Sequence, residues 1–292
     1  MSRRGWLLFL TLGVIWGMPY LLIKIAVTEL TPVSLVFWRT LLASILLLPL
    51  AAIRGELRGL TKVWKPLLAF TAAEMVVPWV LLASAEQRLS SSLAGLLIAT
   101  VPLVAAVLSF FTGGEKLGWR RLLGLGIGLA GVAALVGLDL TADDTWALVQ
   151  IGVVVIGYAV GPYLLDRYLG DQSSLGVMAV AITVSAVVYA PWGIAQTPSA
   201  LPSGKAIASV VMLAVFCSAI ALLVFSALIA EVGPVRTTVI TYVNPAVAII
   251  LGIVFLSEPF TLGIAVGFAL VLAGSYLATY RPRPIPHPQN SR

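Results

Sequence analysis

The tetrapeptide Pro19-Tyr20-Leu21-Leu22 recurs as Pro162-Tyr163-Leu164-Leu165, and each copy lies within a long apolar run. The two copies are separated by 143 positions, from 19 to 162. Other pairs share this separation without a gap: Pro102 with Pro245, Glu115 with Glu258, Gly124 with Gly267, and Gly131 with Gly274. Matching leucines are common in an apolar sequence, but Pro, Glu and spaced Gly matches at one separation are not. The chain is therefore predicted to contain an internal repeat.

Long apolar runs continue along the whole chain. Hydrophobic residues occupy 60% of the 292 positions and charged residues only 10%, whereas soluble domains carry roughly a quarter charged residues. Each run is near the ~20 residues that a helix needs to cross ~30 Å of hydrocarbon. These features predict an all-α membrane protein with most of its mass in the lipid bilayer.

Charged and Gly- or Pro-rich breaks divide the chain into ten predicted transmembrane helices. The predicted spans are 5–27, 32–53, 64–85, 91–111, 120–137, 145–165, 174–194, 204–230, 236–256 and 261–280. Residues 1–140 and 141–280 then hold five helices each, and an odd number makes the second half enter the membrane from the opposite side. We therefore expect two inverted five-helix repeats, followed by a disordered tail over 281–292.

The positions of the basic residues predict the orientation. Most of the 18 Lys and Arg residues fall in short segments on the side of the two termini, so both termini are expected in the cytoplasm and the chain in a bacterial inner (plasma) membrane. The net charge of +6 is spread over loops rather than gathered in one patch, so no nucleic-acid partner is expected. A monomer is the expected state.

Residues for intramembrane catalysis or metal binding are scarce. The single histidine, His287, falls in the tail, and the single cysteine, Cys217, falls in an apolar run. We therefore expect no metal, no cofactor and no enzyme activity. A membrane receptor or scaffold is the alternative from a different class, but it is expected to carry a sizeable soluble module, whereas the loops here are short.

Three features resemble the drug/metabolite transporter superfamily: the stretch Trp16-Gly17-Met18-Pro19-Tyr20-Leu21-Leu22-Ile23-Lys24, the stretch Phe37-Trp38-Arg39-Thr40-Leu41-Leu42-Ala43, and the repeated Pro, Glu and Gly positions. More narrowly, the chain resembles EamA-type ten-helix exporters, which include bacterial aromatic amino acid exporters. The resemblance covers 5–280 and implies a central cavity, alternating access and export of amino acids or other small metabolites. A proton-coupled multidrug exporter is the alternative, although the four-helix multidrug members carry a first-helix carboxylate that this chain lacks.

An aromatic face is predicted on the first helix. Trp16, Tyr20 and Lys24 recur every four residues and so share one side. Lys24 either attracts a substrate carboxylate or extends to the outer headgroups. Further aromatic candidates for substrate contact are Trp79, Tyr158, Tyr163 and Tyr242, and placement at the membrane interface is the alternative for the tyrosines.

The ninth helix carries a polar stripe that includes Thr241 and Asn244. A polar stripe should not face lipid, so it either lines a wet cavity or forms hydrogen bonds between helices. A freed carbonyl or Asn244 would accept from a substrate ammonium.

Arg39 and Glu74 are the ionisable groups predicted well inside the membrane. A charge near mid-bilayer costs at least ~2.5 kcal/mol, so such groups normally face the bundle interior and pair. A mutual ion pair, contact with substrate, and proton titration of Glu74 all remain open. Pairing would hold Glu74 ionised, so we expect export of aromatic or apolar amino acids without obligatory proton coupling.

Prolines and glycines predict mobile and rigid parts of the bundle. An interior proline removes one helical hydrogen bond and provides either a hinge or a static kink; the hinge candidates are Pro19, Pro78, Pro102, Pro162 and Pro245. The fifth and tenth helices carry small-residue faces that predict close packing, formed by Gly124, Gly126, Gly128, Gly131, Gly263, Gly267 and Gly274.

Overall fold

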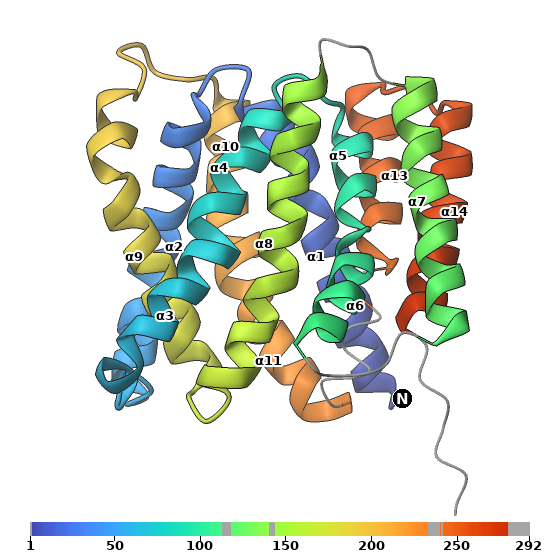
Figure 1. The fold of residues 1–292 in the computed structure, drawn as a ribbon. Helices are drawn as coiled ribbons and strands as arrows, with labels where there is room; N and C mark the ends of the chain where they lie inside the picture. The colour runs from blue at the N-terminus through green and yellow to red at the C-terminus, as the bar shows by residue number, and fades with distance from the viewer. Residues whose placement is uncertain (1, 113–117, 140–143, 233–239, 241, 280–292) are drawn as a thin grey trace, which may run out of the picture.

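The structure is a computed structural model that describes residues 2–112, 118–139, 144–232, 240 and 242–279. Every regular element in these ranges is helical (Figure 1). The predicted all-α class is therefore confirmed.

The helices follow the chain as a series of antiparallel passes. The first half contains α1 (Arg3–Ala26), α2 (Pro32–Ile53), η1 (Leu60–Val63), α3 (Trp64–Thr71), η2 (Ala72–Val76), α4 (Val77–Ala85), α5 (Ser91–Ile98), α6 (Val101–Phe111) and α7 (Trp119–Asp139). The second half contains α8 (Thr145–Leu169), α9 (Ser174–Ala195), α10 (Gly204–Ala214), η4 (Val215–Ile220), α11 (Ala221–Val232), α13 (Asn244–Leu256) and α14 (Leu262–Thr279). Element η1 is a 3-10 turn, whereas η2 and η4 are π-helical.

The part of the chain that the structure describes contains nine helical segments long and apolar enough to cross a membrane, and the shorter apolar helix α13. Several elements combine into one span, as α3, η2 and α4 do over Leu60–Ala85. The tenth predicted span, 236–256, begins outside the described residues, so only α13 can be compared with it. Large apolar side chains such as Ile53, Phe111 and Leu129 are exposed, as expected where helices face lipid. The protein is a multi-pass membrane protein.

The two ends of the bundle are distinguished by the chain termini. In Figure 1, α1 begins at the lower end, where α14 also ends, and α8 begins at the opposite end. Helices α1 and α8 therefore run in opposite directions. We call the end where α1 begins the terminal end and the other the far end.

Element boundaries repeat along the chain at the separation found in the sequence. The π-helical turn η2 begins at Ala72 and η4 begins at Val215, which is 143 positions later. Helices α6 and α13 begin at Val101 and Asn244, again 143 positions apart. The two halves thus share helix interruptions as well as residues.

Helices α7 and α14 pack closely through their glycines. A Cβ added at Gly124 would lie 2.5 Å from the backbone nitrogen of Ala278, and one at Gly274 would collide with the backbone of Gly128. The predicted close packing of these two helices is confirmed. Gly126 is an exception, because a Cβ there would meet nothing within 4 Å.

The hinge candidates fall into two groups. Pro19 and Pro162 lie inside uninterrupted helices, α1 and α8. Pro78 also lies within a continuous helical segment, directly after the π-helical turn η2. Pro102 and Pro245 instead lie in the first turns of α6 and α13, where the missing N–H has no helical partner to lose. These two prolines mark breaks in their spans.

Candidate substrate site

The guanidinium of Arg39 lies between two elements of the bundle interior. Arg39 on α2 is 6% exposed, and its Cζ atom lies 3.7 Å from the centre of the Trp79 ring on α4. Its Nε donates a hydrogen bond to Oγ of Ser218 in η4 at 3.2 Å. Arginine has five N–H donors, and within the described ranges no other hydrogen bond of Arg39 is formed. The position of Arg39 is therefore fixed, and its remaining N–H groups have no hydrogen-bond partner among the described residues.

Trp79 also connects to α8. The Trp79 side chain lies beside the phenol of Tyr158, so one indole contacts both a cation and a phenol. Aromatic faces attract cations through their quadrupole, which favours keeping Arg39 at this depth. Arg39, Trp79 and Tyr158 thus form one contiguous group from α2, α4 and α8.

Glu74 lies in the π-helical turn η2 and faces α8. A Cβ added at Gly161 would collide with its carboxylate, and one at Gly157 would collide with the carbonyl oxygen of Ala73. The glycines therefore let η2 approach α8. The Oε2 atom of Glu74 is buried and has no hydrogen-bond partner among the described residues.

The predicted ion pair between Arg39 and Glu74 is not formed. Arg39 bonds Ser218 and stacks on Trp79 instead, and no salt bridge joins Glu74 to any residue that the structure describes. The reason is geometric, since Glu74 packs on Gly161 of α8. The argument that Arg39 keeps Glu74 ionised therefore loses its basis.

A second buried carboxyl group, Glu86, was not predicted. Its residue follows α4 at the far end and is 0% exposed, and both carboxyl oxygens lack a hydrogen-bond partner in the described part of the chain. Glu86 directly follows the predicted span 64–85 and so lay outside every predicted helix. Electrostatic interactions connect it with Tyr20, Lys24, Arg39 and Tyr158.

The other described glutamates bind serines at the starts of helices. Ser2, Ser173 and Ser203 are N-caps whose hydroxyls accept from their own helices, a common stabilising arrangement, and they also donate to a carboxylate. Ser92 lies in the first turn of α5, whose N-cap is Ser90. The pairs are Glu231 with Ser2, Glu56 with Ser173, Glu29 with Ser203, and Glu258 with Ser92. Each pair joins a residue of 1–140 to one of 141–280.

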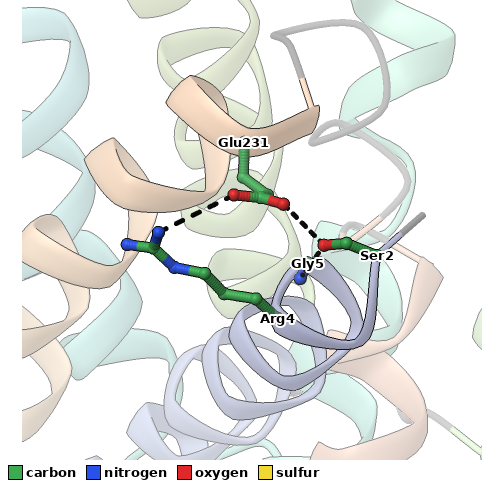
Figure 2. A network of polar contacts seen from close by, with 4 residues as sticks. All are labelled: Ser2, Arg4, Gly5 and Glu231. Carbon is green, nitrogen blue, oxygen red and sulfur yellow. Dashed lines mark hydrogen bonds and ion pairs between the residues drawn. The ribbon is translucent and has the colours of Figure 1, made fainter.

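Figure 2 shows one of these pairs at the terminal end. The hydroxyl of Ser2 accepts from Gly5 N–H at 2.9 Å and donates to Glu231 at 2.5 Å, while Arg4 approaches the same carboxylate at 4.0 Å. At the far end, the hydroxyl and the N–H of Ser203 bond Glu29 and hold the pKa of Glu29 below its usual range. The carboxylates of Glu231 and Glu29 therefore form hydrogen bonds that join the two halves of the chain.

A single family model matches this chain twice. The model described as "EamA-like transporter family" covers residues 3–137 and again residues 145–280. The chain belongs to the EamA-like transporter family. It is 32% identical over 286 residues to "Uncharacterized inner membrane transporter YedA" of Escherichia coli (strain K12), covering 93% of this chain and 91% of that protein.

Two further comparisons concern an exporter and a solved structure. The chain is 29% identical over 297 residues to "Probable terminal-alkyne amino-acid exporter" of Streptantibioticus cattleyicolor, covering 96% of this chain and 95% of that protein. A crystal structure with 21% sequence identity superposes with a TM-score of 0.68 over 96% of this chain and 98% of its own. That likeness shows a shared fold.

The remaining predicted aromatic residues divide between the interior of this EamA protein and its periphery. Trp16 packs on Phe225 of α11, with ring centres 5.1 Å apart, and Tyr20 is 7% exposed. Tyr163 is half-buried on α8. Tyr242 lies at the terminal end, where it shares a hydrogen bond with Thr279 at 2.8 Å. It is therefore away from the Arg39 group.

Lys24 and Asn244 have backbone partners. The Lys24 ammonium donates to the carbonyl oxygens of Glu86 and Leu89 at 2.6 and 2.8 Å. The Asn244 amide nitrogen, oriented so that it faces acceptors, reaches the carbonyl oxygens of Gly13 and Ile240. Both contacts connect helices. Thr241 lies outside the described residues.

Chemically, the interior group offers donors, acceptors and aromatic surface but no metal site. The described ranges contain no cluster of three or more His, Cys, Asp and Glu side chains that could hold a metal ion. Surface pockets of about 210 and 350 Å³ lie at the far and terminal ends, respectively. The pocket at the terminal end borders the Glu56 and Ser173 pair.

Proposed function

We propose that this EamA protein exports amino acids with aromatic or apolar side chains across the bacterial inner membrane, by alternating access around the Arg39 group. The observation that carries the proposal is that the bundle interior holds both hydrogen-bond donors and hydrogen-bond acceptors without partners among the described residues. Arg39 keeps free N–H groups beside Trp79, and Glu74 and Glu86 keep buried oxygens without partners among the described residues. A zwitterion supplies both missing partners.

The chemistry of each substrate group fits one part of this site. A planar guanidinium binds a carboxylate through paired hydrogen bonds, and a buried carboxylate binds an ammonium. Trp16 with Phe225, and Tyr158 with Trp79, offer flat apolar surface for a side chain. An amino acid with an apolar side chain would contact all three features: the guanidinium, a buried carboxylate and the aromatic surface.

The names of two relatives support the proposed export of amino acids. One relative is named as a probable amino-acid exporter and another as an inner membrane transporter. Their names concern those proteins, but the present chain aligns with each over nearly its whole length. A multidrug exporter is the second candidate, since unpartnered carboxylates also suit organic cations.

The architecture proposed for this movement is an inverted repeat. Residues 1–140 and 141–280 form the two repeats, with both termini cytoplasmic and 281–292 as a tail. Support comes from the opposite directions of α1 and α8 and from helix boundaries that recur after 143 positions. In inverted-repeat transporters the substrate binds between the halves near mid-membrane, and Arg39 of one half bonds Ser218 of the other.

The proposed mechanism does not require coupling to protons. The expected uncoupled mechanism rested on the missing first-helix carboxylate and on Arg39 keeping Glu74 ionised, and Arg39 and Glu74 are not paired in the described part of the chain. Export down the amino acid's own gradient is the simplest mechanism that the proposal needs.

Purified protein in liposomes tests the proposal. Vesicles loaded with labelled phenylalanine or leucine should lose label faster than protein-free vesicles when external amino acid is absent. Labelled glutamate serves as the control, because its side chain adds a charge without a partner here. Transport of cationic dyes with no amino acid efflux would instead favour the multidrug alternative.

A further inference from the structure

Two buried carboxyl groups could take part in substrate binding, and they have different surroundings. We propose that Glu86 binds the ammonium group of the substrate while Arg39 binds its carboxylate. This inference rests on the proposed export of amino acids, because it assigns the second charged group of that substrate. Nothing in the sequence pattern pointed to Glu86.

The first argument is the contrast among the glutamates. Four of the described glutamates form hydrogen bonds with serines across the two halves. Glu86 is more deeply buried than any of them, yet its carboxyl oxygens have no partner among the described residues. An unpartnered buried carboxylate is costly, so a partner supplied by a ligand explains why this side chain is directed inward.

The second argument is the local chemistry at the end of α4. The carbonyl oxygens of Glu86 and Leu89 already hold the ammonium of Lys24, at 2.6 and 2.8 Å. The C-terminal end of a helix carries partial negative charge and favours cations. The hydrogen bonds of Lys24 go to backbone carbonyl oxygens and not to the Glu86 carboxyl, whose oxygens keep no hydrogen-bond partner among the described residues even though the two charges interact. Lys24 therefore positions this turn without occupying the site.

The third argument separates Glu86 from Glu74. The ammonium and carboxylate of an α-amino acid are attached to one carbon, so the two protein charges that bind them must be neighbours. Glu86 follows Trp79 by seven residues at the end of α4, so the two side chains share one face of that helix. Trp79 contacts Arg39 on this face, and the charges of Arg39 and Glu86 interact. Glu74 instead lies against Gly161 of α8. Glu86 is thus the carboxyl group better placed to act with Arg39.

Three compounds with the same aromatic ring provide the test: phenylalanine, 3-phenylpropanoate, which lacks the ammonium, and phenethylamine, which lacks the carboxylate. Uptake of each is measured in liposomes with the wild type, Glu86→Gln, Glu86→Asp and Glu231→Gln. Glutamine keeps the shape of Glu86 and removes its charge. Glu231→Gln is the matched control, because Glu231 is a partly exposed glutamate bonded to Ser2.

We expect the wild type to prefer phenylalanine to 3-phenylpropanoate. Glu86→Gln should lower phenylalanine uptake on the order of tenfold to a hundredfold, the range for one hydrogen bond to a charged group, with uptake of 3-phenylpropanoate not reduced. Glu86→Asp should retain the preference, and Glu231→Gln should match the wild type. Size-exclusion profiles in detergent check that each variant folds.

Each other outcome has a definite meaning. A Glu86→Gln protein that folds and still prefers phenylalanine overturns the Glu86 assignment while leaving amino acid export intact. If the wild type carries phenethylamine but not phenylalanine, amino acid export is wrong, and loss of amine uptake in Glu86→Gln still supports Glu86 as the ammonium site. If Glu86→Gln does not fold, loss of the preference in Glu86→Asp counts against the proposal.

Discussion

The Cζ atom of Arg39 lies over the ring of Trp79, 3.7 Å from the ring centre. This contact depends on the planar shape of arginine and not on charge alone, because a lysine ammonium cannot stack in the same way. We therefore expect Arg39→Lys to reduce phenylalanine transport about tenfold or more even though the positive charge remains. Initial rates in liposomes, normalised to inserted protein, measure this effect.

The same contact provides a control for the Arg39 prediction. Trp79→Phe keeps an aromatic face and removes the indole N–H beside Tyr158, so its transport should lie between those of the wild type and Arg39→Lys. Full activity in Arg39→Lys would show that stacking does not matter.

The close approach of η2 to α8 predicts a glycine requirement. Gly161→Ala should lower the free energy of unfolding by about 1–3 kcal/mol, the usual cost of overpacking a core, because its Cβ would collide with Glu74. Thermal unfolding in detergent measures the loss. Gly152 on the same helix is the matched control, because a Cβ there meets nothing within 4 Å.

A double variant tests the cause of that loss. Glu74→Ala combined with Gly161→Ala should recover much of the stability that Gly161→Ala loses, because the colliding carboxylate is gone. Additive losses would place the strain elsewhere, for example at Ala73.

The first turn of α5 depends on a carboxylate from the other half. Glu258 accepts from the N–H groups of Ser91 and Ser92 at 2.7 and 3.0 Å, and from the Ser92 hydroxyl at 2.6 Å. Glu258→Gln weakens a charged helix cap and should cost about 0.5–2 kcal/mol. Ser92→Ala, which removes only the hydroxyl bond, should cost less. Thermal unfolding in detergent measures these losses. Equal unfolding midpoints for the wild type and Glu258→Gln would contradict this role of Glu258.

The bond between Glu29 and Ser203 predicts a pH dependence. Its hydrogen bonds depress the pKa of Glu29 in the folded protein, so the stabilisation is present above the unfolded value of about 4.3 and is lost as the pH falls below it. The stability advantage of wild type over Glu29→Gln should therefore be constant near neutral pH and shrink under acidic conditions. Melting midpoints of both proteins from pH 7 to pH 3.5 check the trend.

Apolar runs were sufficient to predict most of the helical spans. The bounds of α2 and the starts of α3, α5, α8, α9 and α10 agree with the predicted spans, because helix length in lipid is set by hydrocarbon thickness and by capping residues such as Thr31 and Ser173. Trp79, Arg39 and Tyr158 were also among the predicted candidates for substrate contact, and the structure brings these three side chains together.

The contacts of charged side chains were not predictable in the same way. Lys24 binds carbonyls at the end of α4, and Glu86 turns inward there; both depend on how distant helices pack. A local signal for one contact did exist: Gly157 and Gly161 have the four-residue spacing typical of close helix packing. That spacing marks the face of α8 on which η2 lies.

The π-helical turn at Ala72–Val76 also determines the rotational phase of the helix that follows it. Such a turn contains one residue more than the α-helical bonding pattern uses, and the Tyr189 hydroxyl donates to the Val76 carbonyl oxygen there. Deleting one residue from the turn would rotate α4 by roughly 100° relative to α3. Trp79 would then leave the guanidinium of Arg39, with every apolar side chain outside the turn still present. Because η4 has the same position in the second half, length in the middle of these two spans is as tightly constrained as residue identity.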